Sequence, residues 1–373
     1  MFEFIPAKYY QPTALVIAAI LSLFAYMQWA KKDADRMLRD KNTNWIGLLL
    51  YCLLFVWIVG NRPIFGGFGD TYLYAHQYSL CQAGNYVLPD TQKGDWLFNT
   101  LMISCSKVMD VHAFFTIVEA GYIFFALWGL KRIFHNNTWG AWLFFIGAFS
   151  FFSYGTNGIR NGLACSIVIL AFSFLMADKK WEKVVGVAWC LLAISVHKST
   201  LLPCAAMVTS LFVRNPKVSV GLWIFAIALY LVAGNAIADL FASLGFDDRM
   251  TNYVNSAERY AEEYKSGFRA DFLLYSAMPI WLGYEVLVRK RVESKYFPIL
   301  FNTYIFANTF WVMVMGAAYS NRFAYLSWFM YPLVLAYPCL QLDVWGSRQG
   351  KIAGNIMLAH IGFTLFMTFI YYR

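Results

Sequence analysis

Hydrophobic and polar residues alternate along this chain in long blocks rather than in the short period of a soluble domain. Twelve apolar runs can cross a bilayer, at 12–30, 45–60, 112–130, 139–154, 162–177, 184–196, 200–213, 218–236, 270–288, 297–314, 322–340 and 352–371. A spanning helix needs about 20 apolar residues, and tryptophan and tyrosine at the edges complete the shorter runs. The pattern predicts an all-α integral membrane protein, a single polytopic domain over 1–373 with about 12 (11–14) transmembrane helices.

Lysine and arginine gather in every second turn between these runs. Such turns hold 18 of the 30 basic residues and lie at 31–44, 131–138, 178–183, 214–217, 289–296 and 341–351. Basic residues are retained on the cytoplasmic side of a membrane. The distribution therefore predicts that these turns face the cytoplasm and that the N-terminus lies outside.

Two of the predicted outer loops are long, at about 61–111 and about 237–270. In the first, segment 96–109 is apolar but short. If it crossed the membrane, every later basic turn would move outside, so we predict a re-entrant or interfacial helix. In the second, tyrosines from Tyr253 to Tyr264 recur at helical spacing, which predicts an amphipathic helix.

The composition excludes a water-soluble fold, because 60% of residues are hydrophobic and only 14% are charged. The net charge of +9 lies beside the apolar runs, which favours contact with membrane lipids and gives no reason to expect nucleic acid. The seven scattered cysteines form no disulfide framework. The chain has no zinc, nucleotide or dinucleotide motif, so we expect no cofactor and no metal.

Two predicted outer turns carry side chains suited to chemistry. Arg160 precedes the run 162–177 and His197 ends the run 184–196, so two crossings bring both to the same membrane surface. An arginine fork binds a diphosphate well, and an imidazole can take a proton from a sugar hydroxyl. Lys198 adds a second cation. The alternative is structural, an anchoring arginine and a histidine that caps a helix.

Other candidates lie on the same predicted side. Asp70, in the glycine-rich bend 66–74, can act as the base or orient a sugar, or it is a solvated turn residue. Residues expected to bind the diphosphate or sugar are Tyr74, Arg249, Arg259, Arg269 and Arg322. Glu119 falls within a predicted span, so it should face the helix bundle and find a partner, as a proton-coupling group or a structural one.

With these residues identified, the chain resembles the EpsG family of Wzy-type bacterial polysaccharide polymerases from about residue 45 to 335. Four pieces carry the resemblance in order, and they are 69–74, 94–101, the hairpin from 159–164 to 195–199, and 321–325. The hairpin is the most specific, because it joins Ile159-Arg160-Asn161-Gly162 to Val196-His197-Lys198-Ser199. Asn161 stands where glutamine is common in the family.

The resemblance implies a bundle like that of GT-C-type lipid-dependent glycosyltransferases. It implies a polymerase of oligosaccharide repeat units carried on undecaprenyl diphosphate, for exopolysaccharide, capsule or O-antigen. The site would lie at the periplasmic or extracellular face of the bacterial inner membrane, and the flippase and chain-length regulator of the pathway would be partners. Arg160 and Arg322 would stabilise the leaving diphosphate, and His197 or Asp70 would take the proton.

Three other functions fit the same residues. A ligase or a polyprenyl-phosphate-sugar transferase would also need outer arginines and a base. A flippase could use Glu119 for coupling and the arginines to hold the diphosphate, although charge biased to one face favours chemistry there over transport. A structural subunit of an export complex would not need the polar outer turns.

Overall fold

The computed structural model describes residues 6–39, 45–86, 94–243, 267–317 and 320–372, and within them the regular elements are all helices. Five helical stretches are long and apolar enough to span a membrane, and they are Ala7–Trp29, Val111–Ile146, Pro216–Gly234, Asn321–Leu340 and Gly346–Tyr371. Two shorter apolar helices are Trp45–Gly60 and Ile159–Leu175. The protein is therefore an all-α membrane protein, whereas the count of about 12 spans stays a prediction.

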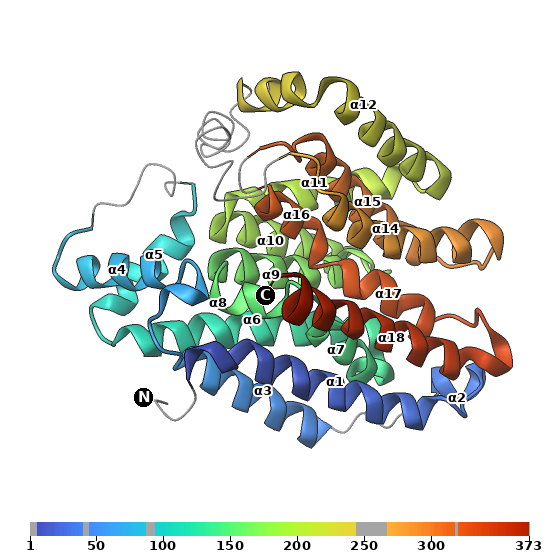
Figure 1. The fold of residues 1–373 in the computed structure, drawn as a ribbon, viewed down its shortest axis with the longest axis horizontal. Helices are drawn as coiled ribbons and strands as arrows, with labels where there is room; N and C mark the ends of the chain where they lie inside the picture. The colour runs from blue at the N-terminus through green and yellow to red at the C-terminus, as the bar shows by residue number, and fades with distance from the viewer. Residues whose placement is uncertain (1–5, 40–44, 87–93, 244–266, 318–319, 373) are drawn as a thin grey trace. The chain divides into compact units, whose positions relative to one another are not determined.

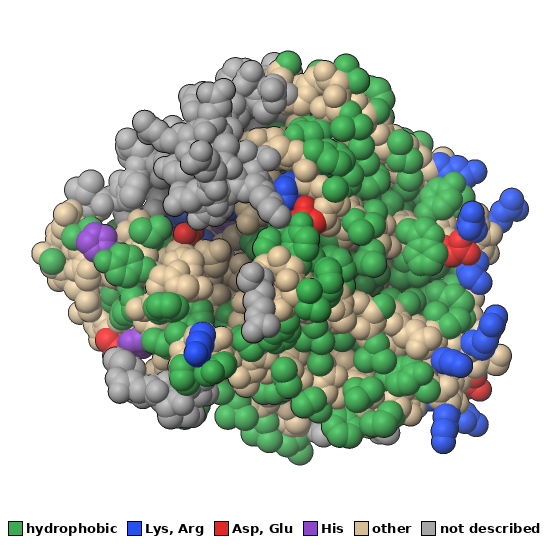
Figure 2. Space-filling view, viewed as in Figure 1, with side chains coloured by type: hydrophobic (Ala, Val, Ile, Leu, Met, Phe, Trp, Pro, Cys, Tyr) green, Lys and Arg blue, Asp and Glu red, His purple; other side chains and the backbone are tan. Residues whose placement is uncertain are grey.

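Many large apolar side chains are exposed on the described surface, among them Ile46, Phe212 and Val232 at 75%, 82% and 86% exposure. Figure 2 shows hydrophobic side chains over much of the described part of one face. Apolar surface on this scale is unfavourable in water, and lipid tails solvate it without cost.

The chain divides into two compact units, one of Met1–Lys198 with Cys339–Arg373 and the other of Ser199–Pro338. The expectation of a single domain stays a prediction. Unit 1 contains α1 (Tyr10–Trp29), α2 (Ala34–Arg39), α3 (Trp45–Gly60), α4 (Thr71–Gln82), α5 (Trp96–Ser106), α6 (Val111–Phe134), α7 (Thr138–Ile146), α8 (Phe151–Thr156), α9 (Ile159–Leu175), α10 (Lys180–Val196) and α18 (Gln349–Phe366).

Helix α9 forms the centre of unit 1. Every residue from Ile159 to Phe174 is buried, because α6 packs on one side of the helix and α10 on another (Figure 1). Beyond Arg160 and Asn161 in its first turn, its sequence is apolar or small all round, which is the composition of a helix enclosed by other helices. Around this centre, α3 packs on α6 and α1 packs on α18.

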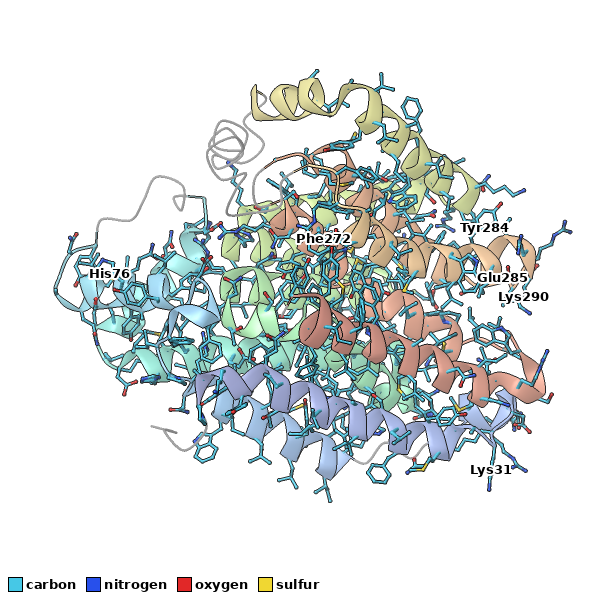
Figure 3. The ribbon with its side chains drawn as sticks, in the orientation of Figure 1. Lys31, His76, Phe272, Tyr284, Glu285 and Lys290 are labelled. Atoms are coloured by element: carbon cyan, nitrogen blue, oxygen red, sulfur yellow. The ribbon has the colours of Figure 1, made fainter. Side chains whose placement is uncertain are left out.

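The basic turns of unit 1 meet at one end of the helices. The Gly350 amide donates to the Lys32 carbonyl at 3.0 Å, and the Gln341 side chain donates to the Phe134 carbonyl at 3.0 Å. A salt bridge of 2.7 Å joins Arg132 of the turn 131–138 to Glu182 of the turn 178–183. Figure 3 places Lys31 at this end and His76 of α4 at the opposite end of the unit. Which end faces the cytoplasm stays a prediction.

Unit 2 contains α11 (Leu201–Phe212), α12 (Pro216–Ser243), α14 (Ala270–Tyr284), a π-helical turn at Glu285–Arg289, α15 (Phe297–Met313), α16 (Asn321–Trp328) and most of α17 (Tyr331–Leu340). Its central helix is α15, which packs on α11, α12 and α16. Buried amides join these helices, since Asn302 donates to the Val213 carbonyl at 2.7 Å and Asn308 donates to Ser327 at 3.0 Å. Such bonds hold helices together where lipid removes the hydrophobic driving force.

Several boundaries differ from those predicted. The loop 61–111 holds α4, which was not predicted, and α5, which ends at Ser106 rather than at 109. Helix α12 bends at Ala233 and continues past 237 to Ser243, where a loop was predicted. The predicted amphipathic helix between Tyr253 and Tyr264 lies outside the described residues.

Two predicted spans are each divided into two helices. The run 139–154 breaks between α7 and α8, where Gly147 caps α7. The run 322–340 breaks between α16 and α17. Pro332 explains the second break, because proline has no N–H to donate to the carbonyl four residues earlier and clashes with it.

We expect Gly350→Ala to destabilise the protein, because a Cβ there would overlap the backbone oxygen of Trp29. The overlap should cost about 1–3 kcal/mol, since backbone atoms cannot move aside. The control is Gly362→Ala in the same helix, where a Cβ would have no atom within 4 Å. Thermal unfolding in detergent measures both, and equal melting temperatures would contradict the close packing of α1 and α18.

Candidate functional site

The side chain of Asp95 lies where three parts of unit 1 meet. Asp95 precedes α5 as its N-cap residue and is 3% exposed. Its Oδ2 lies 2.9 Å from Arg160 Nη1 and 3.2 Å from His197 Nδ1, and its Oδ1 accepts a bond of 2.8 Å from the Lys198 amide. The structure therefore brings Arg160, His197 and Lys198 together, as the two-crossing argument predicted, and it does so through a carboxylate that the prediction did not include.

Arg160 is almost completely buried at the start of α9, with 6% exposure. Its guanidinium carbon lies 5.6 Å from the centre of the Tyr74 ring and 5.8 Å from that of Phe98, within the range of cation–π attraction. Its contact with Asp95 is an ion pair, and among the described residues neither Nε nor Nη1 has a hydrogen-bond partner. Arg160 thus holds unused N–H donors, which is rare for a buried arginine.

The turn between α8 and α9 fixes the backbone of Arg160. The Gly162 amide donates to the Gly158 carbonyl at 2.8 Å, which starts the helix around the arginine. A Cβ on Gly162 would overlap the carbonyl oxygen of Tyr154 in α8. Glycine is therefore required there for α8 and α9 to approach so closely, and this approach sets the position of the arginine.

His197 ends α10 with an extended backbone, φ −150° and ψ 108°, while its amide still donates to the Ala193 carbonyl at 2.9 Å. The sequence left open that the His197 ring caps the end of the helix. Its Nδ1 instead faces the Asp95 carboxylate. When Nδ1 carries the proton and donates it to Asp95, Nε2 is left as the basic nitrogen of the ring. The side chain of Lys198 lies against Gly94, next to Asp95.

Asp95 is ionised throughout the physiological range. Burial alone would raise its pKa, but the hydrogen bond and charge of His197, the charge of Arg160 and the Lys198 amide together lower the pKa to about 2. A carboxylate that accepts several hydrogen bonds favours its charged form in this way. The site therefore keeps a fixed negative charge between its cation and its imidazole.

Asp70 belongs to a bend that is attached to the turn preceding Arg160. Its amide donates to Asn157 Oδ1 at 2.9 Å, and Gly69 before it has φ +63°, a conformation that favours glycine. Asp70 is also one of the groups that act electrostatically on Arg160. The bend therefore places a second carboxylate in the surroundings of the arginine, as its position in the sequence suggested.

Arg62, which the sequence did not single out, holds this bend in place. Its side chain is fully buried and lies 4.5 Å from the centre of the Phe115 ring. Its Nε donates to Thr71 Oγ1 at 3.0 Å, and Thr71 in turn donates to the Thr156 carbonyl at 2.7 Å. Its Nη1 donates to the Val59 carbonyl at 2.9 Å. The only sequence signal was a lone cation directly after an apolar run.

Glu119 of α6 is 1% exposed and faces the helix bundle. It lies against Gly155 of α8, and its charge interacts with that of Arg62. Within the described residues its Oε1 has no hydrogen-bond partner. The partner of Glu119 is therefore the charge of Arg62, whose side chain also donates to the Thr156 carbonyl.

The remaining candidates belong to unit 2 or lie outside the described residues. Arg322 is half-buried in the first turn of α16. Arg269 forms a bidentate pair with Asp271, at 2.9 and 2.7 Å, and stacks on Phe272 at 3.7 Å. This pairing already occupies its fork, so a diphosphate would have to displace Asp271. Arg249 and Arg259 are not among the described residues.

The described part of the chain contains no group of three or more His, Cys, Asp or Glu side chains arranged to hold a metal ion. The expectation of a metal-independent reaction stays a prediction.

The chain is similar to a known protein family. The model of the EpsG family matches residues 44–373, which is most of the chain. Neither the search of curated proteins nor the search of solved structures found a match.

We expect Arg62→Lys to destabilise unit 1 by about 2 kcal/mol or more, because a lysine cannot bond Val59, Thr71 and Thr156 together. Arg39→Lys is the control, since the Arg39 side chain is 81% exposed and its pair with Asp35 contributes little. Melting temperatures of both variants in detergent check this, and a wild-type value for Arg62→Lys would contradict a structural role.

The lowered pKa of Asp95 predicts a pH dependence of stability. Because the pKa is about 2 in the folded protein and about 3.9 in an unfolded chain, the charge of Asp95 stabilises the fold fully above pH 4. This contribution should disappear as the pH falls towards 2. We therefore expect the difference in melting temperature between wild type and Asp95→Asn to stay constant from pH 7 to 5 and to shrink below pH 4. A difference that shrinks already near pH 6 would show that another group is responsible.

Proposed function

Because the chain belongs to the EpsG family, we propose that it is a polymerase of oligosaccharide repeat units carried on undecaprenyl diphosphate. It would act in the synthesis of exopolysaccharide, capsule or O-antigen. We place it in the bacterial inner membrane as a multi-pass bundle of about 12 helices, of the GT-C-like kind, with its active site at the periplasmic or extracellular face. Flippase and chain-length regulator are its proposed partners.

One observation supports this function most strongly. A buried arginine with unused donors, Arg160, and a histidine, His197, share the carboxylate of Asp95. Arg160 lies in the first turn of α9, whereas Ser173 near the other end of that helix is bonded to Arg132, which pairs with Glu182 of a basic turn. An arginine fork fits two oxygens of a diphosphate, and the headgroup of a lipid-linked substrate lies at the depth of a helix end.

The proposed reaction is a displacement at the anomeric carbon of the growing chain. A hydroxyl of the acceptor unit attacks this carbon, and the bond from the carbon to the lipid diphosphate breaks. The diphosphate leaves with the bonding electrons, and Arg160 stabilises the negative charge that develops on it. Asp95 holds His197 through Nδ1, which makes Nε2 the ring nitrogen that takes the hydroxyl proton. No step needs a metal.

Asp70 is the alternative base, because its bend is attached to the turn before Arg160. The Tyr74 and Phe98 rings, 5.9 Å apart and both buried, border the arginine and hold its guanidinium beside Asp95. Lys198 is proposed to add positive charge for the diphosphate, and Arg322 stays a candidate for that role from the sequence. Arg269 would take part only after releasing Asp271, and Arg249 and Arg259 stay candidates from the sequence.

We expect Arg160→Ala and His197→Ala each to lower the rate of polymerisation by about 100-fold or more. The controls are Arg348→Ala and His76→Ala, both exposed residues outside the cluster, which should keep the wild-type rate. The assay incubates purified protein with its lipid-linked repeat unit, with and without EDTA, and separates the products by size.

A ladder of products that survives EDTA and is lost in both cluster variants is the expected result. A single transfer product would indicate a ligase or a sugar transferase, since only a polymerase makes a ladder. Transport of the lipid-linked unit across liposomes without any new bond would indicate a flippase, and Glu119 would then become the group to test.

A further inference from the structure

Asp95 is in contact with both of the groups to which the proposed function assigns different tasks. Its Oδ2 is 2.9 Å from Nη1 of Arg160, which is proposed to hold the leaving group, and 3.2 Å from Nδ1 of His197, which is proposed to be the base. Nδ1 of His197 also lies 3.3 Å from Oδ1, so the imidazole faces both oxygens, whereas the 2.9 Å contact of Arg160 is with Oδ2. Asp95 is 3% exposed, so water does little to screen these interactions.

We infer that Asp95 is a shared counter-ion that couples binding of the diphosphate at Arg160 to the action of His197 as a base. This inference rests on the proposed function and assigns Asp95 as a positioning residue within it. In the absence of substrate, Asp95 neutralises part of the charge of Arg160. When a diphosphate binds the arginine, its negative charge takes over that task, and Asp95 then interacts mainly with His197.

The geometry supports such a transfer. The contact between Arg160 and Asp95 lacks the direction of a hydrogen bond, so an incoming oxygen can take the unused donors of the arginine without first breaking one. The Lys198 amide meanwhile keeps Oδ1 in place at 2.8 Å. Asp95 therefore stays beside His197 while the arginine exchanges its partner.

The groups that face Asp95 and Arg160 set the electrostatic environment of each side chain. Asp95 faces the side chains of Arg160 and His197 and the neutral amide of Lys198. Arg160 faces the Tyr74 hydroxyl, to which it is hydrogen-bonded, and the carboxylates of Asp95 and Asp70. An ionised Asp95 stabilises the positive charge that His197 gains when Nε2 takes a proton, and it holds the ring in the tautomer that leaves Nε2 basic. The same negative charge weakens the attraction of Arg160 for an anion.

Removing the charge of Asp95 should therefore raise the affinity of Arg160 for a diphosphate and lower the rate at which His197 acts as a base. Asp95→Asn keeps the shape of the side chain and an oxygen for the Lys198 amide, but it frees the charge of Arg160 and removes the counter-ion of His197. We expect undecaprenyl diphosphate without sugar, in detergent micelles, to bind this variant about 10-fold more tightly than wild type. We expect its turnover number with the full lipid-linked substrate to fall by about 100-fold.

The matched control is Asp35→Asn, because the Asp35 side chain is 66% exposed in α2, among the basic turns. It should change neither value. A further variant, Asp95→Glu, keeps the charge and moves the carboxylate, so it should bind the probe as wild type does and have a turnover between wild type and the asparagine variant. If the asparagine variant does not fold, as judged by thermal unfolding, the glutamate variant alone tests the inference: a fall in turnover at unchanged affinity supports it.

Binding and turnover that fall together in Asp95→Asn, or in Asp95→Glu, would show a merely structural role and overturn the inference. Unchanged binding of the probe by a folded Asp95→Asn would overturn it as well. Both outcomes leave the proposed function standing, provided that wild type makes a ladder and Arg160→Ala does not. If wild type neither binds the probe nor makes polymer, the proposed function fails, and the inference fails with it.

Discussion

The carboxylate of Asp95 is the interaction on which the rest of the site depends. It draws together residues from three parts of the chain that are about 35 to 100 positions apart, because a buried charge must find opposite charge and hydrogen-bond donors. Removing either partner would leave charge in a poorly solvated environment. The start of α5, the start of α9 and the end of α10 are therefore fixed relative to one another by one electrostatic requirement.

The membrane environment explains why this requirement is met at a helix end. Helix α9 is enclosed along its length by other helices, and its arginine lies in its first turn. Within unit 1 the basic turns are joined at one end, whereas Asp70, Asp95, Arg160 and His197 lie in turns of the other. Arg62 is a second buried cation that follows a helix, and its hydrogen bonds to Thr71 and to the Val59 carbonyl hold the bend that contains Asp70. Most buried charge of unit 1 described here thus lies at helix ends, where an opposite charge or backbone carbonyls face it.

The sequence predicted most helices of unit 1, because a spanning helix needs a long apolar run and such runs are visible without tertiary context. It also predicted that Arg160 and His197 emerge on one side, since two crossings separate them. It did not predict Asp95 or Arg62. Asp95 looks like an ordinary polar residue before a helix, and its importance comes from burial and from partners far along the chain. Helix α4 was missed because it is only weakly apolar, and the bends at Ala233 and before Tyr331 interrupt runs that read as continuous.

The central claim is that a lipid diphosphate held by Arg160 leaves as each glycosidic bond forms. The most direct test is to measure, in one reaction of the purified protein with its lipid-linked repeat unit, the undecaprenyl diphosphate released and the new bonds made. Our account predicts that both rise together in equal amounts and that Arg160→Ala abolishes both. Polymer that grows without release of the lipid diphosphate, or release that continues unchanged in Arg160→Ala, would contradict it.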